Sequence, residues 1–187
     1  MGRLIYGMNV SLDGYIADAD GDISWGVSTE ELFRWWLEEE QSMSLMLYGR
    51  KLWETMSSYW PTGDQAPDAR PDQVEYARNW RDTPKMVFAS DCLPLDWNTR
   101  LFTGEAVAEI RRLKKQFIGS IRIGGASLAS AAMRAGLIDE YTLVTHPVLV
   151  GGGTPFFALI DRYIHLELVE TRVFDGGVTM GRYRFAG

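Results

Sequence analysis

Residues 120–135 constrain the fold of this chain more than any other stretch. Ile121 and Ile123 indicate a short buried strand, Gly124 and Gly125 follow it, and small residues from Ala126 onward open a helix. Adjacent glycines let the backbone approach a ligand closely, and a helix start offers free N–H groups and a positive dipole end. The pattern predicts either a phosphate-binding turn or a tight turn that eases packing of a helix on a sheet.

The same alternation of strand and helix runs through the first three-quarters of the chain. Apolar runs predict strands at 4–10, 43–48, 85–89, 120–124 and 141–150, and periodic segments predict helices at 28–40, 50–56, 104–116 and 126–135. Residues 62–73, rich in Pro, Gly and Asp, are expected to form a loop, and 166–174 with 178–185 a hairpin. We therefore expect a single α/β domain over residues 1–187, with a mostly parallel sheet flanked by helices and a C-terminal antiparallel hairpin.

Composition excludes several functional classes. The net charge of −6 over 187 residues argues against nucleic-acid binding and gives no sign of a membrane partner. The single cysteine, Cys92, rules out an internal disulfide and a cysteine-based zinc cluster. His146 and His165 have no partner at helical spacing, so no metal site is expected. Without a signal core or a long apolar run, the sequence suggests a soluble, cytoplasmic protein.

Polar and basic residues gather where predicted strands end, which is where open α/β sheets bind ligands. After the second strand, Arg50 offers a bidentate fork and Lys51 a point charge for phosphates. Cations at a helix start oppose the dipole, so an anionic ligand is favoured over a solvated helix start. Neither G-x-G-x-x-G nor a P-loop is present. The four strand ends are Asp13-Gly14, Gly49-Arg50-Lys51, Ser90 and Gly124-Gly125.

The roles of an aspartate, two tryptophans and an acidic block also have to be considered. Asp13, at a strand end among apolar neighbours, is either a proton donor or substrate anchor whose pKa is raised by burial, or a turn former. Trp53 and Trp60 are either stacking walls for a planar substrate or core residues. The acidic block at residues 38–40 opposes the dipole at its helix end, so we expect it to stay in solvent.

A serine hydrolase is a competing hypothesis for the same turn. The run from Gly125 to Ala129 is one residue short of the G-x-S-x-G elbow, and Asp139 and His146 follow Ser127 in the required order. Against it, Asp139 leads directly into a strand, His146 precedes a proline, and no oxyanion loop lies upstream. Ser127 is more simply a residue of the helix start.

Several motifs together resemble the dihydrofolate reductase-like superfamily. They are residues 9–17 (NVSLDGYIA), Gly49-Arg50, Ser90, the Gly124-Gly125 turn and residues 147–156 (PVLVGGGTPF), in family order over nearly the whole chain. The match is nearer to the C-terminal reductase domain of bacterial bifunctional riboflavin-biosynthesis deaminase-reductases. No deaminase motif accompanies it.

The resemblance implies an NADPH-dependent reductase. Gly124 and Gly125, with Ala126, Ser127 and Leu128, would hold the pyrophosphate, and Gly49, Arg50 and Lys51 would contact phosphates. Ser90 would lie near the adenosine 2′-phosphate, and the loop with Gly14 and Ala17 would cover the nicotinamide. Hydride would pass to a C=N or C=O bond of a pterin-like or ribosylamino-pyrimidine-like small molecule.

Two residues depart from the family pattern. Leu52 stands where the family usually has a phosphate-contacting Thr, and Asp91 stands where a basic residue often follows Ser90. An acidic Asp91 would repel a 2′-phosphate, so NADH is not excluded as the cofactor. A nucleotide-binding protein without turnover is the alternative to a reductase, and the resemblance also suggests a homodimer formed through the C-terminal strands.

Overall fold

An eight-stranded sheet forms the centre of the computed structural model, which describes residues 1–91 and 95–186. Cys92 lies outside the described residues. The strands follow the order β5-β4-β3-β6-β1-β7-β10-β9. Their bounds are Arg3–Ser11 (β1), Met43–Gly49 (β3), Lys85–Phe88 (β4), Thr99–Phe102 (β5), Ser120–Gly124 (β6), Glu140–His146 (β7), Leu166–Val173 (β9) and Thr179–Phe185 (β10).

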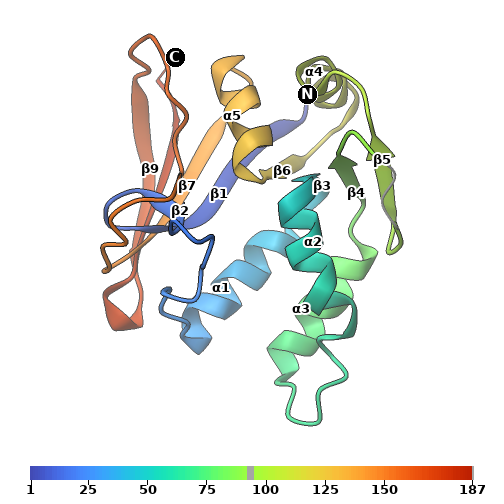
Figure 1. The fold of residues 1–187 in the computed structure, drawn as a ribbon, viewed down its shortest axis with the longest axis vertical. Coiled ribbons are helices and arrows are strands. Elements are labelled where there is room, and N and C mark those ends of the chain that lie inside the picture. Colours follow the sequence, from blue (N-terminus) through green and yellow to red (C-terminus); the bar gives the residue numbers. More distant parts are fainter. Residues whose placement is uncertain (92–94, 187) are drawn as a thin grey trace.

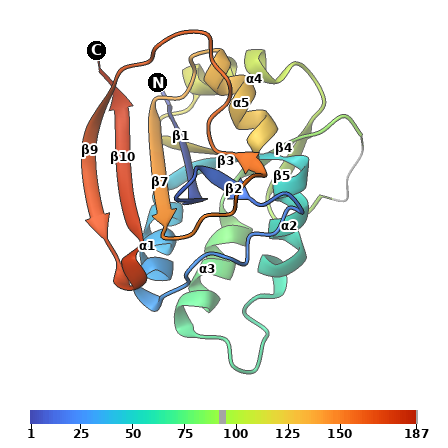
Figure 2. The ribbon, with the colours of Figure 1, turned by 60° about the vertical axis from the view of Figure 1, so that its left-hand side comes forward.

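Parallel pairing extends from β5 to β7, and β10 then pairs antiparallel with β7 on one side and with β9 on the other. Figure 2 shows β7, β10 and β9 side by side at one margin of the molecule. The predicted fold class, a mostly parallel α/β sheet with a C-terminal antiparallel hairpin, is therefore confirmed.

Helices cover both faces of the sheet (Figure 1). On one face, α4 (Ala106–Gln116) and α5 (Ala126–Arg134) pack on alternate strand residues such as Leu4, Leu47 and Ile123. On the other face, α1 (Glu30–Gln41), α2 (Arg50–Tyr59) and α3 (Pro71–Asp82) pack on residues of the opposite parity, including Ile5 and Met46. This period-two alternation is what a strand buried on both faces requires.

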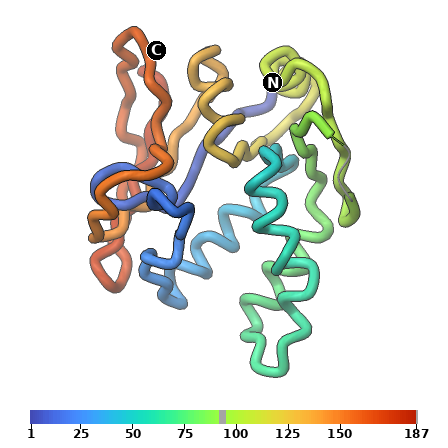
Figure 3. Tube along the Cα trace, in the orientation of Figure 1, coloured from blue at the N-terminus to red at the C-terminus, as the bar shows by residue number. Residues whose placement is uncertain are grey.

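A small second sheet ties the N-terminal loop to the C-terminal region. β2 (Tyr15–Ala17) pairs antiparallel with β8 (Thr154–Pro155), and the blue and orange segments lie side by side in Figure 3. A Cβ at Gly153 would collide with the backbone of Ala17 and Asp18. This close approach explains why the loop before β8 needs glycine.

Besides the short strands β2 and β8, the sequence prediction misses α3 and β5. Residues 62–73 are not all loop, because α3 begins at Pro71, where the fixed φ of proline suits the first turn of a helix. Gln73 Oε1 accepts from the Arg70 N–H at 3.0 Å and caps that start. The edge strand β5 was also not predicted. The first helix begins at Glu30 and not at residue 28, because Thr29 caps it by accepting from the Leu32 N–H at 3.2 Å.

Candidate functional site

At the glycine turn after β6, the backbones of two strand ends approach each other closely. Gly125 has φ of +93°, a conformation that L side chains rarely adopt, and it precedes the first residue of α5. A Cβ at this position would lie 3.2 Å from the backbone N and Cα of Gly49. Two glycines from neighbouring strand ends therefore face each other, and neither leaves a side chain in the space between β3 and β6.

Two helix starts open onto this point. Neither α2 nor α5 has a side-chain cap, since their N-cap residues are Gly49 and Gly125. The first-turn N–H groups of both helices are thus left for a ligand, and both dipoles present their positive ends. This arrangement suits a pyrophosphate.

A cleft of about 490 Å³ follows these helix starts, and we call it the phosphate cleft. Of the predicted cofactor residues, the structure brings seven into its lining: Gly49, Arg50, Lys51, Gly125, Ala126, Ser127 and Leu128. Leu52, Phe88, Ala106, Ala131 and Thr154 complete it. Among the residues that the structure describes, Gly14, Ala17 and Ser90 are not part of this lining.

Arg50 is paired at the outer end of the phosphate cleft. Its guanidinium donates to Asp91 at 2.9 Å, and Glu54 lies 3.9 Å away. Both carboxylates are more than half exposed, so water screens these contacts. Asp91 therefore faces the same cation that an incoming phosphate would use.

A second cavity of about 340 Å³ lies next to the phosphate cleft, and we call it the aromatic cavity. Leu52 lines both spaces, and Gly124 belongs to this cavity while Gly125 belongs to the cleft. Trp60 is in its wall, packed against Tyr76 at 4.0 Å between ring centroids. The remaining lining consists of Gly7, Met8, Asn9, Ile23, Phe33, Trp36, Glu40, Tyr48, Met56, Arg122 and Ile123.

Two charged residues in the aromatic cavity were not predicted. Glu40 and Arg122 are each more than nine-tenths buried, and Arg122 Nε lies 3.1 Å from Glu40 Oε1. The acidic block was expected to stay in solvent, which is wrong for Glu40 and for Glu39, whose carboxylate contacts Arg182 at 2.7 Å. The charged residue at the centre of the otherwise apolar β6 was the signal that could have indicated a polar site.

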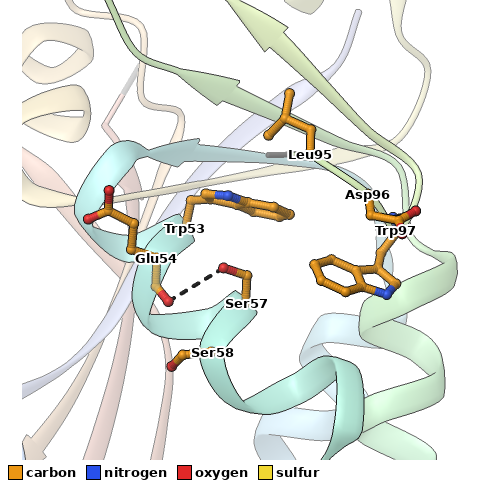
Figure 4. Close-up of a pocket in the computed structure, with 7 residues that line it drawn as sticks. All are labelled: Trp53, Glu54, Ser57, Ser58, Leu95, Asp96 and Trp97. Carbon is orange, nitrogen blue, oxygen red and sulfur yellow. Dashed lines mark hydrogen bonds between the residues drawn. The ribbon is translucent and has the colours of Figure 1, made fainter. Parts of the chain in front are cut away.

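Trp53 does not reach the aromatic cavity. Its ring is 2% exposed and stacks on Trp80 with centroids 5.6 Å apart, so the core interpretation holds and the stacking-wall interpretation is wrong. Its exposed edge lies in a separate hollow between α2 and the segment before β5, with Trp97 opposite (Figure 4). The dashed line there is the hydrogen bond from Ser57 Oγ to the Glu54 carbonyl, at 3.4 Å.

Asp13 is exposed, so the expectation of a buried carboxyl with a raised pKa is wrong. Ser11 Oγ donates to it at 2.6 Å, and the backbone N–H groups of Gly151 and Val150 donate at 2.8 and 3.2 Å. The hydrogen bond from Ser11, together with these N–H groups, lowers the pKa of Asp13. A carboxylate held in this way is ionised at neutral pH and ties the turn after β1 to the glycine loop before β8.

The residues of the hydrolase hypothesis are not assembled. Asp139 precedes β7 and His146 ends it, so the strand separates them by about 20 Å at the usual rise per residue. Asp139 instead accepts from the Leu4 N–H and from Lys114 Nζ, at 2.7 and 2.6 Å. His146 is buried, and its Nδ1 accepts from the Val27 N–H at 3.0 Å. Ser127 therefore has no catalytic histidine and aspartate beside it.

Residues 1–91 and 95–186 contain no cluster of three or more His, Cys, Asp or Glu side chains that could hold a metal ion. They also contain no helix that is both long and apolar enough to cross a membrane.

Known proteins match this chain over most of its length. The RibD C-terminal domain family model matches residues 3–180. An uncharacterized protein of Bacillus subtilis (strain 168), YyaP, is 30% identical over 187 residues, covering 99% of this chain and 96% of that protein.

Solved structures share the fold at low sequence identity. A putative riboflavin biosynthesis protein from Shewanella sp. PV-4 has a TM-score of 0.77 at 20% identity, with 99% of each chain covered. Dihydrofolate reductase from Enterococcus faecalis, solved in complex with NADP(H), has a TM-score of 0.67 at 17% identity, covering 100% of this chain and 98% of that one.

Proposed function

This chain belongs to the RibD C-terminal domain family, and from that premise we propose that it is an NAD(P)H-dependent reductase. The proposed reaction is hydride transfer to a C=N or C=O bond of a pterin-like or ribosylamino-pyrimidine-like small molecule. One observation carries the proposal: a cleft suited to phosphates adjoins an aromatic cavity, with Leu52 in both linings.

The residues of the phosphate cleft fit a dinucleotide. Uncapped starts of α2 and α5 suit its pyrophosphate, and the facing glycines at 49 and 125 leave room for it. The aromatic cavity lies toward β1, and the Arg50–Asp91 pair lies toward β4, beyond the opposite end of the cleft. We therefore place the nicotinamide at Leu52 and Gly124, and the adenosine toward β4.

A bound reduced nicotinamide would supply the hydride to the substrate carbon, and the solvent would supply the proton that the substrate nitrogen or oxygen takes up. The chain's own residues position the reactants. Phe33 and Trp60, whose ring centroids lie 6.0 Å apart, would form one aromatic wall against a planar ring and exclude water from that side of it. We assign Asp13 a positioning role, because its ionised carboxylate holds the loop that leads to Thr154 at the cleft.

NADPH is the cofactor that the family resemblance favours, and the structure leaves NADH as a second candidate. Arg50 and Lys51 supply positive charge at the cleft, whereas Asp91 and Glu54 offset it beside Arg50. Gly14, Ala17 and Ser90 stay proposed cofactor contacts, which would require the loops carrying them to close over the bound dinucleotide.

Thermal unfolding tests the cofactor assignment. At a concentration of 100 Kd, a ligand stabilises a protein by about 2.7 kcal/mol, so NADPH or NADH should raise the melting temperature by several degrees. Arg50→Ala should remove most of that rise, and Arg34→Ala, an exposed arginine on α1, should preserve it. The absence of a rise with both dinucleotides would rule out the assignment.

Turnover distinguishes a reductase from a protein that only binds the nucleotide. NADPH oxidation against a panel of pteridines and ribosylamino-pyrimidines should show a rate above background. Binding without oxidation of any member would favour the non-catalytic alternative.

We also propose a cytoplasmic homodimer. The edge strand β9 exposes Leu168 and Val173, at 56% and 72%, together with the unpaired backbone groups that an edge strand carries. A second copy of the hairpin would cover both. Light scattering of the purified protein should give twice the chain mass, and a monomer mass at micromolar concentration would contradict this.

A further inference from the structure

Arg122 carries buried positive charge into the aromatic cavity without a hydrogen bond. It lies in β6 between Ile5 of β1 and Met46 of β3, and its side chain is 7% exposed. Within the described residues, none of its three guanidinium nitrogens has a hydrogen-bond partner. The contact with Glu40 at 3.1 Å is an ion pair in poor hydrogen-bond orientation. Buried donors without partners are uncommon, and these donors lie in the lining of a cavity that a ligand could occupy.

The backbone of β1 makes room for this side chain. A Cβ at Gly7 would lie 2.5 Å from Arg122 Nη1. The same Cβ would lie 3.2 Å from Thr142 Cβ, so glycine at this position leaves room for both the guanidinium and the neighbouring strand. Trp36 covers the guanidinium from the helical side, with its ring centre 5.4 Å away.

Glu40 supplies the complementary charge. It lies in the last turn of α1, where the helix dipole does not favour an acid, and burial raises its pKa while Arg122 partly offsets this. Glu39 also lies 3.5 Å from Arg122 but contacts Arg182 more closely, at 2.7 Å. The cavity therefore contains a donor and an acceptor side by side and no excess positive charge.

We infer that Arg122 and Glu40 together recognise the polar edge of a neutral planar heterocycle, a carbonyl oxygen next to a ring N–H. The carbonyl accepts from the Arg122 guanidinium, and the N–H donates to the Glu40 carboxylate. Phe33, Trp60 and Tyr76 pack against one another and form the aromatic wall that the ring lies against. This assignment rests on the proposed function, in that it names the substrate class of the same cavity.

The balance of charge gives the pair its selectivity. A carboxylate or phosphate in the cavity would meet Glu40 and Glu39 as well as Arg122, so an anion gains little from this position. A cyclic amide satisfies one donor and one acceptor at once, and no charge has to be removed from water. Any phosphate on the substrate would then have to lie outside the aromatic cavity.

Two probes of the same ring test this on the unmodified protein. Isothermal titration at pH 7 with lumazine, whose ring presents adjacent C=O and N–H groups, should show binding. 1,3-Dimethyllumazine, with both N–H groups blocked, should bind at least about ten-fold more weakly, as expected for a lost charge-assisted hydrogen bond. Equal affinities, or no binding of lumazine, would overturn the inference.

Substitutions then assign the effect to the pair. Arg122→Met and Glu40→Gln should each weaken lumazine binding roughly 10- to 100-fold and reduce the difference between the two probes. Arg100→Met, an exposed arginine on β5, should leave both affinities unchanged. Glu40→Gln should also improve binding of the anion orotate, because it leaves Arg122 unbalanced, an effect that mere loss of packing would not produce. Unchanged lumazine affinity in Arg122→Met would contradict the assignment.

The rise in melting temperature that NADPH causes is measured on the same protein samples. It should persist in Arg122→Met and Glu40→Gln, which would show that both variants are folded. If the unmodified protein binds the two probes equally but still shows this rise, only the inference about Arg122 and Glu40 is overturned. If the unmodified protein shows no rise, the cofactor assignment is overturned.

Discussion

Asp13 and Glu40 show how far the environment of one residue departs from its local sequence. Asp13 follows an apolar run, yet its carboxylate is exposed and held by Ser11 and the glycine loop. Glu40 belongs to an acidic run, yet it is buried against Arg122. Arg122 is distant in the sequence from Glu40, and Gly151 is distant from Asp13, so neither local composition nor helix position reveals these partners.

Asp91 makes the cofactor preference testable. Its carboxylate neutralises Arg50 and would repel a third phosphate nearby. Asp91→Asn should raise the affinity for NADPH relative to NADH by about five-fold, since one partly screened charge interaction is worth about 1 kcal/mol. Titration calorimetry with both dinucleotides measures the ratio, with Asp68→Asn, an exposed carboxylate on another loop, as the control. An unchanged ratio would place the 2′-phosphate away from Asp91.

Because His146 is buried, we expect the free energy of unfolding to depend on pH. Burial lowers its pKa, and its Nδ1 accepts a hydrogen bond that requires this nitrogen to be unprotonated. Above about pH 6.5 the imidazole is neutral in both folded and unfolded chains, so the full stabilisation is present. As the pH falls below that value, the unfolded chain binds the proton first, and the free energy of unfolding decreases.

His146→Asn isolates this contribution, because the amide oxygen can still accept from the Val27 N–H but does not titrate. Urea unfolding at pH 7.5 and at pH 5.5 should show a larger loss of stability in the unmodified protein than in the variant. Equal losses would assign the pH dependence to other groups.

At the scale of elements, the sequence predicts every parallel strand except β5 and every helix except α3. The strands are apolar on both faces, and that signal is strong. α3 was missed because its first residue, Pro71, ends a loop-like stretch, and β5 because a four-residue edge strand carries little pattern. The glycine turn after β6 was located correctly, but its approach to Gly49 depends on how β3 and β6 pair.

Gly125→Ala tests whether that approach serves the dinucleotide. The new Cβ would lie 3.2 Å from the Gly49 backbone at a positive φ, so both strain and lost space are expected. Gly21→Ala is a matched control, since Gly21 has φ of +86° with nothing within 4 Å. Both should lose roughly 1–2 kcal/mol from the φ requirement, but only Gly125→Ala should lose the NADPH-induced rise in melting temperature. A full rise in melting temperature in Gly125→Ala would mean that the pyrophosphate does not bind beside Gly125.

At the scale of the molecule, the site exists because of the strand order. β6 enters the sheet between β3 and β1, which brings the Gly124–Gly125 turn beside Gly49 and brings Arg122 beside Gly7. Sequence patterns predict strands but not their order in the sheet. The family resemblance placed Gly49 and Gly125 at one cofactor and so indicated the phosphate cleft, but it did not indicate the aromatic cavity. The aromatic cavity draws on β1, β3, β6, α1, α2 and α3, so no single stretch could reveal it.

A crystal structure of this protein grown with NADP⁺ tests the central claim most directly. The pyrophosphate should lie at the start of α5 beside Gly125, and the nicotinamide should lie at Leu52 and Gly124, facing the aromatic cavity. A dinucleotide bound elsewhere, or a nicotinamide directed away from that cavity, would contradict the assignment of a reductase site.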